Sequence, residues 1–330
     1  MNSSKLLVLE GLRKKLLLKV LMRVGIWMAV FLPALGWLTW KVIQVYSHEF
    51  RITNDGEILL AAIGLLLFAY FLAAIYLSKK IKKIIYKYLY QGGYADMYKA
   101  EILVKAIPEM LPGLSYNATQ GIPRDDFSQS GFPLFRNPDR YYSSGELTGA
   151  IGSTAFSFAE VLAEEYRQDG DSQPTWQDLF RGVFFVVDLQ KHTDSNTLVY
   201  PDGVKYFAPL LLGKLSQEKL RYQRVKLEDV AFEKYFEVYG TDQTETRYML
   251  SPALMDRMVD FTKQTGKKLQ FSFKGSKAYF GIYYPMGKML FIPPLFSSVN
   301  DTRTLETYVA QVRMMTEIIK ALNMNAAYVK

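Results

Sequence analysis

The sequence predicts an α+β protein in which an N-terminal hairpin of two transmembrane helices precedes a soluble domain of antiparallel sheet with flanking helices. Three observations predict this class. The long apolar runs are confined to the first 90 residues, and segments of alternating apolar and polar residues dominate from Tyr141 onward. The basic charge is segregated as well, because residues 1–90 carry 13 Lys and Arg against 4 Asp and Glu, whereas the remaining residues carry 27 against 28.

The segment 58–77 is the clearer of the two predicted membrane spans. It contains twenty uncharged residues, enough at about 1.5 Å per residue to cross a hydrocarbon core of about 30 Å. A juxtamembrane helix follows, with one lysine face opposite an isoleucine-rich face. We expect this face to bind anionic lipid head groups, at about 1 kcal/mol for each lysine. Its members are Lys79, Lys80, Lys82, Lys83 and Lys87.

The other predicted span is 24–43, preceded by a basic flank at 1–23. Pro33 lies within this span, and proline is tolerated in spanning helices. Trp37 and Trp40 are expected at the far membrane interface, with Lys41 extending outward. A cleaved signal peptide is the alternative, since a basic start, an apolar run and the small residues Ala34 and Gly36 also fit that pattern.

The connector 44–57 sets the expected orientation. Its charged residues are Glu49, Arg51, Asp55 and Glu57, whereas the outer flanks of both spans are basic. Because positive residues remain inside, we expect both termini and the large domain to be cytoplasmic. Residues 24–90 would then comprise the two spans and the basic juxtamembrane helix.

Residues 91–140 are predicted as a helix followed by a proline-rich linker. A helical pattern covers 95–107, and five prolines then fall within 31 residues. The linker is expected to be extended, with short strands possible at 115–119 and 132–135.

Residues 141–330 are predicted to form the cytoplasmic α+β domain. Its expected first strands are 146–152, 154–165, 180–189 and 197–200, the last two separated by a turn at 193–196. Further strands are expected at 225–227, 236–240 and 247–250, with a brief helix at 229–235. Ser251 and Pro252 predict the start of a helix that ends at Gly266.

The last segments are predicted to form a hairpin-rich sheet and a final helix. Strands are expected at 269–273, 278–284 and 289–292, with the first two joined near Gly275. Asp301 is expected to cap the final helix. The apolar stripe expected to face inward from this helix consists of Leu305, Val309, Val312, Ile319 and Leu322.

Few residues suggest chemistry. Absence of cysteine excludes a disulfide scaffold and a cysteine nucleophile, and the two histidines, His48 and His192, lie too far apart in the predicted topology to share a metal site. His192 with Asp188 and Asp194 is expected to be a solvated turn. No cofactor is predicted, because Walker and Rossmann glycine patterns are missing.

Two other groups of residues have both a structural and a functional interpretation. Gly145, Gly149 and Gly152 could approach a phosphate, but strand bends or bulges are favoured. Glu160, Glu164 and Glu165 could be catalytic carboxylates, although outward carboxylates on a half-buried strand are ordinary.

An aromatic segment near the C-terminus raises the question of nucleic-acid binding. Residues 273–296 interleave Lys274, Lys277 and Lys288 with aromatic residues, but a strand pair with a buried aromatic face is favoured over base stacking. Nucleic-acid binding is not expected, because the large domain is close to neutral.

The run VKLEDVAFEKYFEVYGTDQTETRYMLSPALMDRMVDF, followed by FSFKGSKAYFGIYY and MLFIPPLF, resembles the bacterial membrane-protein family named domain of unknown function 3137. The matching positions are 227–229, 232–239, Asp242 with Gln243, and 250–255. The resemblance implies an inner-membrane protein, and it suggests a LemA-type membrane protein as partner. It brings no catalytic residues.

These observations predict a membrane-anchored cytoplasmic binding or scaffolding module. The alternative is a membrane-tethered enzyme that acts on a lipid, nucleotide or glycan through carboxylates. A pocket in which Glu160, Asp188 or Asp242 converge would favour the enzyme. A sensor that signals through the hairpin is a third possibility, for which the connector is short.

Overall fold

The computed structural model describes residues 3–53, 56–91, 93–132, 135, 137–168, 174–202, 222–284, 292–299 and 301–326. The chain divides into two compact units. One comprises Met1–Ala95 together with Pro294–Asn300, and the other comprises Asp96–Pro293 and Asp301–Lys330. Each unit is described by itself below.

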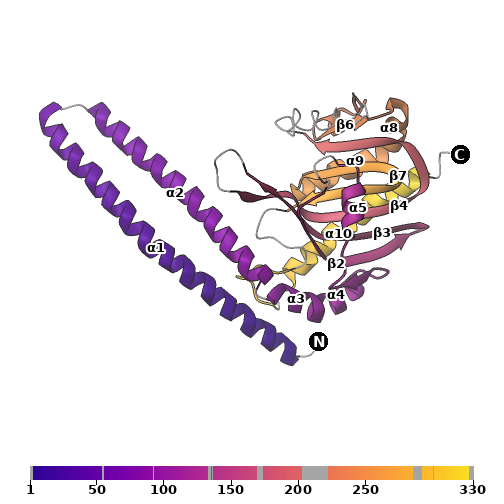
Figure 1. Cartoon of the computed structure of the whole chain (residues 1–330), viewed down its shortest axis with the longest axis horizontal. Coiled ribbons are helices and arrows are strands. Elements are labelled where there is room, and N and C mark those ends of the chain that lie inside the picture. The colour runs from indigo at the N-terminus through magenta and orange to yellow at the C-terminus, as the bar shows by residue number, and fades with distance from the viewer. Residues whose placement is uncertain are drawn as a thin grey trace. The chain divides into compact units, whose positions relative to one another are not determined.

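The N-terminal unit contains two long helices, α1 (Ser3–Thr53) and α2 (Gly56–Gln91) (Figure 1). Both extend beyond the predicted spans, so the expected connector 44–57 is helical as far as Thr53. The helices contact each other through the stacked rings of Phe31 and Tyr76, whose centroids are 6.3 Å apart. Among the described residues, one helix segment, Leu6–Lys41, is long and apolar enough to cross a membrane.

The first turns of α1, predicted only as a basic flank, also have a buried side. Leu9, Arg13, Leu16 and Val20 are buried, and their 4-3-4 spacing places them on one side of the helix. Arg13 Nη1 donates to the Leu295 carbonyl at 2.6 Å, and Glu10 accepts from the Val299 N–H at 3.2 Å. Arg13 is therefore held by a segment from near the other end of the chain.

The α/β unit is built on an antiparallel sheet (Figure 1). Its described strands are β1 (Ser115–Asn117), β2 (Arg140–Ile151), β3 (Thr154–Arg167), β4 (Thr175–Pro201), β5 (Gln223–Val225), β6 (Phe236–Gly240) and β7 (Leu269–Tyr283). The order is β1-β2-β3-β4-β6-β5, and β7 pairs with β4. The predicted α+β class with an antiparallel sheet and flanking helices is confirmed.

The centre of the sheet corrects two sequence predictions. β4 is continuous where a turn was expected at 193–196, and β7 is continuous where a hairpin was expected at Gly275. The two strands pair from Gly182↔Tyr283 to Val199↔Phe271, with register shifts near Thr193. The polar residues there do not form a turn but bond to a neighbouring helix. Thr193 Oγ1 and the Ser195 N–H both donate to the Glu245 carboxylate of that helix, at 2.5 and 3.1 Å.

That neighbouring helix, α8 (Gln243–Met249), replaces the strand predicted at 247–250. Asp242 caps it by accepting from the Glu245 N–H at 2.8 Å, a typical helix start. The shorter helix α7 (Val230–Glu233) begins in the same way at Asp229. The 247–250 prediction failed because apolar alternation in so short a segment does not distinguish a strand from a helix.

One face of the sheet is covered by the proline-rich region. Phe127, Phe132 and Phe135 are buried there against Phe180 and Phe184 of β4. Phe127 belongs to a short helix, α5 (Arg124–Gln129), which lies in front of the sheet in Figure 1. The extended linker expected at 108–140 is therefore part of the core, and neither described residue of the strand expected at 132–135, Phe132 or Phe135, lies in a strand. The short strand expected at 115–119 is confirmed by β1.

Helices α9 (Pro252–Thr265) and α10 (Arg303–Ala326) lie on the side of the sheet away from α5 (Figure 1). The start of α9 is confirmed, since Ser251 Oγ accepts from the Leu254 N–H at 3.3 Å, and so is its end at Gly266, whose φ is +63°. The predicted stripe of α10 is buried. Thr302, not the predicted Asp301, immediately precedes α10 and its carbonyl accepts from the Glu306 N–H at 2.9 Å, while Asp301 accepts from the Arg303 N–H at 3.1 Å.

Candidate functional site

The lysines predicted to bind lipid head groups lie on α2. Lys79 and Lys82 are exposed. Lys80 is half-buried, with its Nζ 4.2 Å from the ring centroid of Trp27 in α1, so this cation also links the two helices. The side chains of Lys83 and Lys87 lie outside the described residues. Lipid binding by this set stays a prediction.

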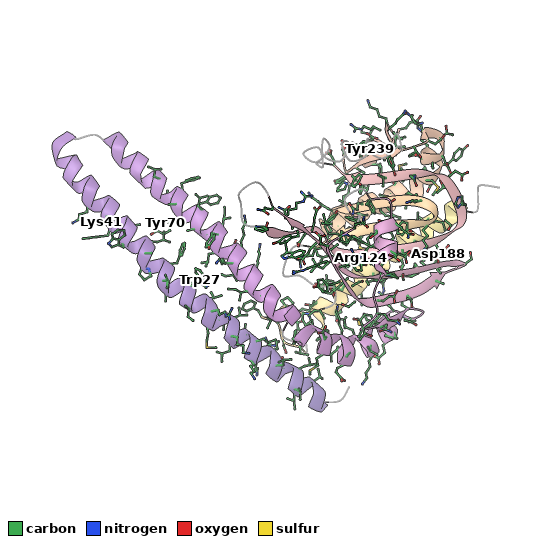
Figure 2. All side chains as sticks on the ribbon, viewed as in Figure 1. Trp27, Lys41, Tyr70, Arg124, Asp188 and Tyr239 are labelled. Atoms are coloured by element: carbon green, nitrogen blue, oxygen red, sulfur yellow. The ribbon has the colours of Figure 1, made fainter. Side chains whose placement is uncertain are left out.

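The side chains of α1 and α2 are apolar and outward-facing over a long stretch (Figure 2). Ile26 and Val30 are each 65% exposed, Leu65 is 71% exposed and Phe71 is 61% exposed. Large contiguous apolar surfaces on a protein mark a contact with a membrane or another protein. This surface is the first candidate site.

A second candidate is a buried charged group in the α/β unit. Lys99 opens a five-residue π-helix, Lys99–Leu103, between α3 (Tyr94–Tyr98) and α4 (Val104–Met110). Its Nζ donates to Glu160 Oε2 at 2.6 Å and to Ser144 Oγ at 3.0 Å. The side chains of Lys99 and Glu160 are only 3% and 12% exposed. Single π-helical turns are rare and frequently occur at functional sites.

A bulge in β2 brings Ser144 to Lys99. The pairing of β2 with β3 shifts register between Ser144 and Leu147, and Gly145 has a φ of +73°. A Cβ at Gly145 would lie 3.0 Å from the Tyr116 hydroxyl and 3.3 Å from Lys99 Nζ. Glycine is therefore needed for both its backbone conformation and its small size. The predicted strand bulge is confirmed at this glycine.

Two tyrosines lie within electrostatic range of Glu160. Burial raises the pKa of Tyr308 to about 12, and the negative charge of Glu160 acts in the same direction. The pKa of Tyr284 is also raised, first by burial and then by Tyr308 and Glu160. Lys267 Nζ donates to the Tyr284 hydroxyl at 2.6 Å. Glu160, Tyr284 and Tyr308 therefore influence one another electrostatically on the side of the sheet that α10 covers.

The structure does not bring the suspected carboxylates together. Glu160 is bound by Lys99. The pKa of Lys277 is raised most by the Asp126 carboxylate at 2.7 Å, and Asp188 in β4 is close enough to raise it further. Residues 160 and 188 are on opposite faces of the sheet by strand alternation. Asp242 caps α8. Each carboxylate has a separate structural role.

The remaining candidates are also dispersed. Glu165 pairs with Arg167 at 2.5 Å. His192 lies in β4 and not in the predicted turn; it is exposed, with its Nε2 3.4 Å from Asp194 Oδ1. The side chain of His48 is outside the described residues. Within the described part of the chain, no group of three or more His, Cys, Asp or Glu could hold a metal ion.

The aromatic segment has the predicted buried face. Phe271, Phe273 and Phe280 of β7 are fully buried, and Phe280 stacks on Phe185 at 4.0 Å between ring centroids. Lys274 and Lys277 reach the α5 segment instead, where Lys274 donates to the Gln129 carbonyl. Lys288 lies outside the described residues.

Sequence reasoning missed Lys99, Tyr116 and Tyr308. A signal for Lys99 exists, because Ile102 and Leu103 follow it at helical spacing and both are buried. Lys99 therefore lies on the apolar face of a predicted helix, where a lysine is rare unless a carboxylate pairs with it. Nothing in the local sequence identifies Glu160 as that carboxylate.

The fold and the exposed apolar surface place this protein in a broad structural class, that of α+β proteins with an apolar N-terminal helix. Residues 178–324 match the family model described as "Protein of unknown function (DUF3137)". Over these residues the chain is similar to that family, which confirms the resemblance seen in the sequence.

The other comparisons add little. No curated protein matches the chain. Among solved structures, the crystal structure of the mycobacterial trehalose monomycolate transport factor A, TtfA, is similar with a TM-score of 0.32 and 9% sequence identity. The alignment covers 63% of this chain and 87% of that chain. A similarity this low carries no inference about fold or function.

Proposed function

We propose that this protein is a binding or scaffolding module anchored in the bacterial inner membrane by a hairpin of α1 and α2, with both termini and the α/β unit in the cytoplasm. The observation that supports it most is the exposed apolar surface of α1 and α2. It includes tryptophans near a cation, as in the contact of Lys41 with Trp40 at 5.5 Å, which is typical of a membrane interface.

The energetics favour lipid as the solvent of these helices. Removing one large aliphatic or aromatic side chain from water contributes about 1.5 to 3 kcal/mol. Side chains as exposed as Ile26, Val30, Leu65 and Phe71 therefore oppose solubility strongly. The 36-residue segment Leu6–Lys41 is also longer than the about 20 residues that a span requires.

The membrane anchor is tested by fractionation and by a topology reporter. We expect the full chain to sediment with membranes, to resist carbonate extraction, and to release into detergent. Protease added outside intact cells should leave residues after 91 uncut. Recovery of the full chain in the supernatant after ultracentrifugation would contradict the anchor.

The orientation is tested by charge reversal on α2. Exchanging Lys79, Lys80, Lys82, Lys83 and Lys87 for Glu should invert or disrupt the topology, because the positive flank would become negative. A matched control reverses five exposed lysines of the α/β unit and should leave the topology reporter unchanged; these are Lys105, Lys226, Lys234, Lys263 and Lys320. An unchanged reporter in the α2 variant would refute the proposed role of the flank.

A binding role is preferred to catalysis because Glu160, Asp188 and Asp242 each hold a structural partner in a different place. Affinity capture of the tagged full chain from membranes, with identification of co-purified proteins and lipids, tests this role. The LemA-type partner is a specific outcome of that capture. Its absence under crosslinking conditions that preserve other membrane complexes would count against it.

The alternative, a membrane-tethered enzyme acting on a lipid, nucleotide or glycan, has one observation in its favour. Lys99 and Glu160 meet at a π-helix beside Gly145 in a strand bulge, and buried charged pairs of this kind also occur in active sites. Incubation of the purified chain with these three substrate classes, compared with Glu160→Gln, tests it. Turnover that Glu160→Gln abolishes while the fold persists would favour the enzyme.

A further inference from the structure

A groove at one end of the α/β unit has a concentration of lysines that the proposed membrane anchor does not explain. Its volume is about 450 Å³, within the range of small-ligand sites. Three segments line it: the end of β4, the turn after α7, and the end of α9 with the residues that follow. The lining residues that carry charge or a ring are Asp202, Lys234, Tyr235, Lys263, Lys267 and Lys268.

Backbone contacts fix the walls of this groove. The Asp202 N–H donates to the Tyr235 carbonyl at 2.6 Å, which joins the end of β4 to the turn after α7. On the other wall, the Gly266 N–H donates to the Thr262 carbonyl at 2.9 Å, and the left-handed conformation of Gly266 ends α9. The chain therefore turns at Gly266, so that Lys263 and Lys268 from either side of it both line the groove.

The charge of the groove is strongly positive. Four lysines face one aspartate, and the C-terminal end of α9 adds about half a negative charge. Lys234, Lys263 and Lys268 are exposed. In the described part of the chain, no carboxylate lies within ion-pair distance of these three ammonium groups.

Two lysines have additional contacts that shape the site. Lys267 is half-buried and donates to the Tyr284 hydroxyl and to Gln311 Oε1, at 2.6 and 2.5 Å, so its charge is fixed at the wall. Lys263 Nζ lies 5.7 Å from the centroid of the Tyr235 ring. The groove thus offers one fixed cation, three exposed cations and one aromatic face.

A favourable helix dipole explains a lysine at the end of α9, but not the whole set. Lys263 is in the last turn of α9, where a cation contributes about 0.3 to 1 kcal/mol. Lys234 and Lys268 come from other segments, and like charges gathered at one groove repel each other. An anion relieves that repulsion, and a compact anion with several oxygens can accept from three ammonium groups at once.

The geometry points to this groove as a binding site for a phosphate-bearing anion, either a lipid head group or a soluble phosphate compound. The inference gives the proposed binding module a ligand class, and to that extent rests on the proposed function. Its test is made in detergent solution, so that its outcome does not depend on whether the chain is anchored in a membrane.

The experiment titrates the full chain, in a non-ionic detergent, by isothermal titration calorimetry with three probes. Inorganic pyrophosphate represents a soluble phosphate, dihexanoyl phosphatidylglycerol an anionic head group, and dihexanoyl phosphatidylcholine a head group without net charge. The variant Lys234→Gln/Lys263→Gln/Lys268→Gln removes the three exposed cations. The matched control, Lys105→Gln/Lys226→Gln/Lys320→Gln, removes the same charge from exposed positions outside the groove lining.

We expect at least one of the two anionic probes to bind, and the groove variant to bind it at least tenfold more weakly, with the control variant within twofold of the original chain. Binding of pyrophosphate alone identifies a soluble phosphate ligand, and binding of phosphatidylglycerol alone identifies a head group. Three results would overturn the inference: neither anion binds at millimolar concentration, both variants weaken binding equally, or phosphatidylcholine binds as tightly as phosphatidylglycerol.

Discussion

Replacing Lys99 with methionine tests whether the buried pair holds the α/β unit together. Methionine retains most of the side-chain length but removes the ammonium group, so Glu160 loses the cation at 2.6 Å and Ser144 loses a donor at 3.0 Å. Both charged side chains are nearly excluded from water, at 3% and 12% exposure. Removing one partner of such a pair lowers the free energy of unfolding by about 3 to 5 kcal/mol.

The effect is measured by thermal unfolding of the full chain in detergent, followed by near-ultraviolet circular dichroism. For a unit of this size, about 2 to 4 °C of Tm corresponds to each kcal/mol, so Lys99→Met should lower Tm by about 6 to 20 °C. The double variant Lys99→Met/Glu160→Gln should lose less than the sum of the two single variants, because they share one interaction.

The exposed pair of Lys320 and Glu317 supplies a control. Their side chains are 52% and 43% exposed, and an exposed pair contributes less than about 1 kcal/mol. Lys320→Met should therefore change Tm by no more than about 4 °C. If Lys99→Met were no more destabilising than Lys320→Met, the buried pair would not have the structural role assigned to it.

Three further predictions follow from backbone geometry and burial. Gly266→Ala should cost about 1 kcal/mol from its φ of +63° alone, since nothing lies within 4 Å of the added Cβ; denaturant unfolding measures this, and a cost above 3 kcal/mol would indicate an unseen steric contact. Gly182→Ala should cost about 3 kcal/mol, because its Cβ would lie 1.9 Å from the Ile282 carbonyl oxygen; full β4 protection in hydrogen exchange would contradict this. Burial raises the pKa of Tyr98 and of Tyr308 to about 12, so their contribution to stability is complete below pH 10 and is lost as pH rises to 12. The tyrosinate absorbance of the original chain minus that of Tyr98→Phe/Tyr308→Phe isolates these two groups; a difference that titrates near pH 10 before unfolding would refute that burial effect.

The elements that the sequence predicted correctly are those specified by nearby residues. Helix α9 begins at Ser251 and Pro252 and ends at Gly266, all within its own turns. The stripe of α10 is visible because apolar residues recur at helical spacing. Strand β3 follows from alternation alone, and the similarity to the family model over 178–324 agrees with the motifs seen in that region.

The elements that were predicted wrongly depend on distant partners. Thr193 and Ser195 have the composition of a turn, but Glu245, some fifty residues away, accepts their hydrogen bonds and lets β4 continue. Gly275 was expected to end a strand, yet it pairs with Thr193 within a continuous β7. A strand ends only where its hydrogen-bonding partners end, and those partners belong to other segments.

The amino-acid sequence by itself determined the segregation of charge, an apolar N-terminal helix, the caps of α9 and the apolar stripe of α10, because each depends on residues within a few positions of one another. Only the tertiary structure decided which charges are buried: Lys99 meets Glu160 from 61 residues away, and Arg13 meets the Leu295 carbonyl from 282 residues away. The reason is physical, since a charge can leave water only where the fold supplies its partner, and that partner has no fixed distance along the chain.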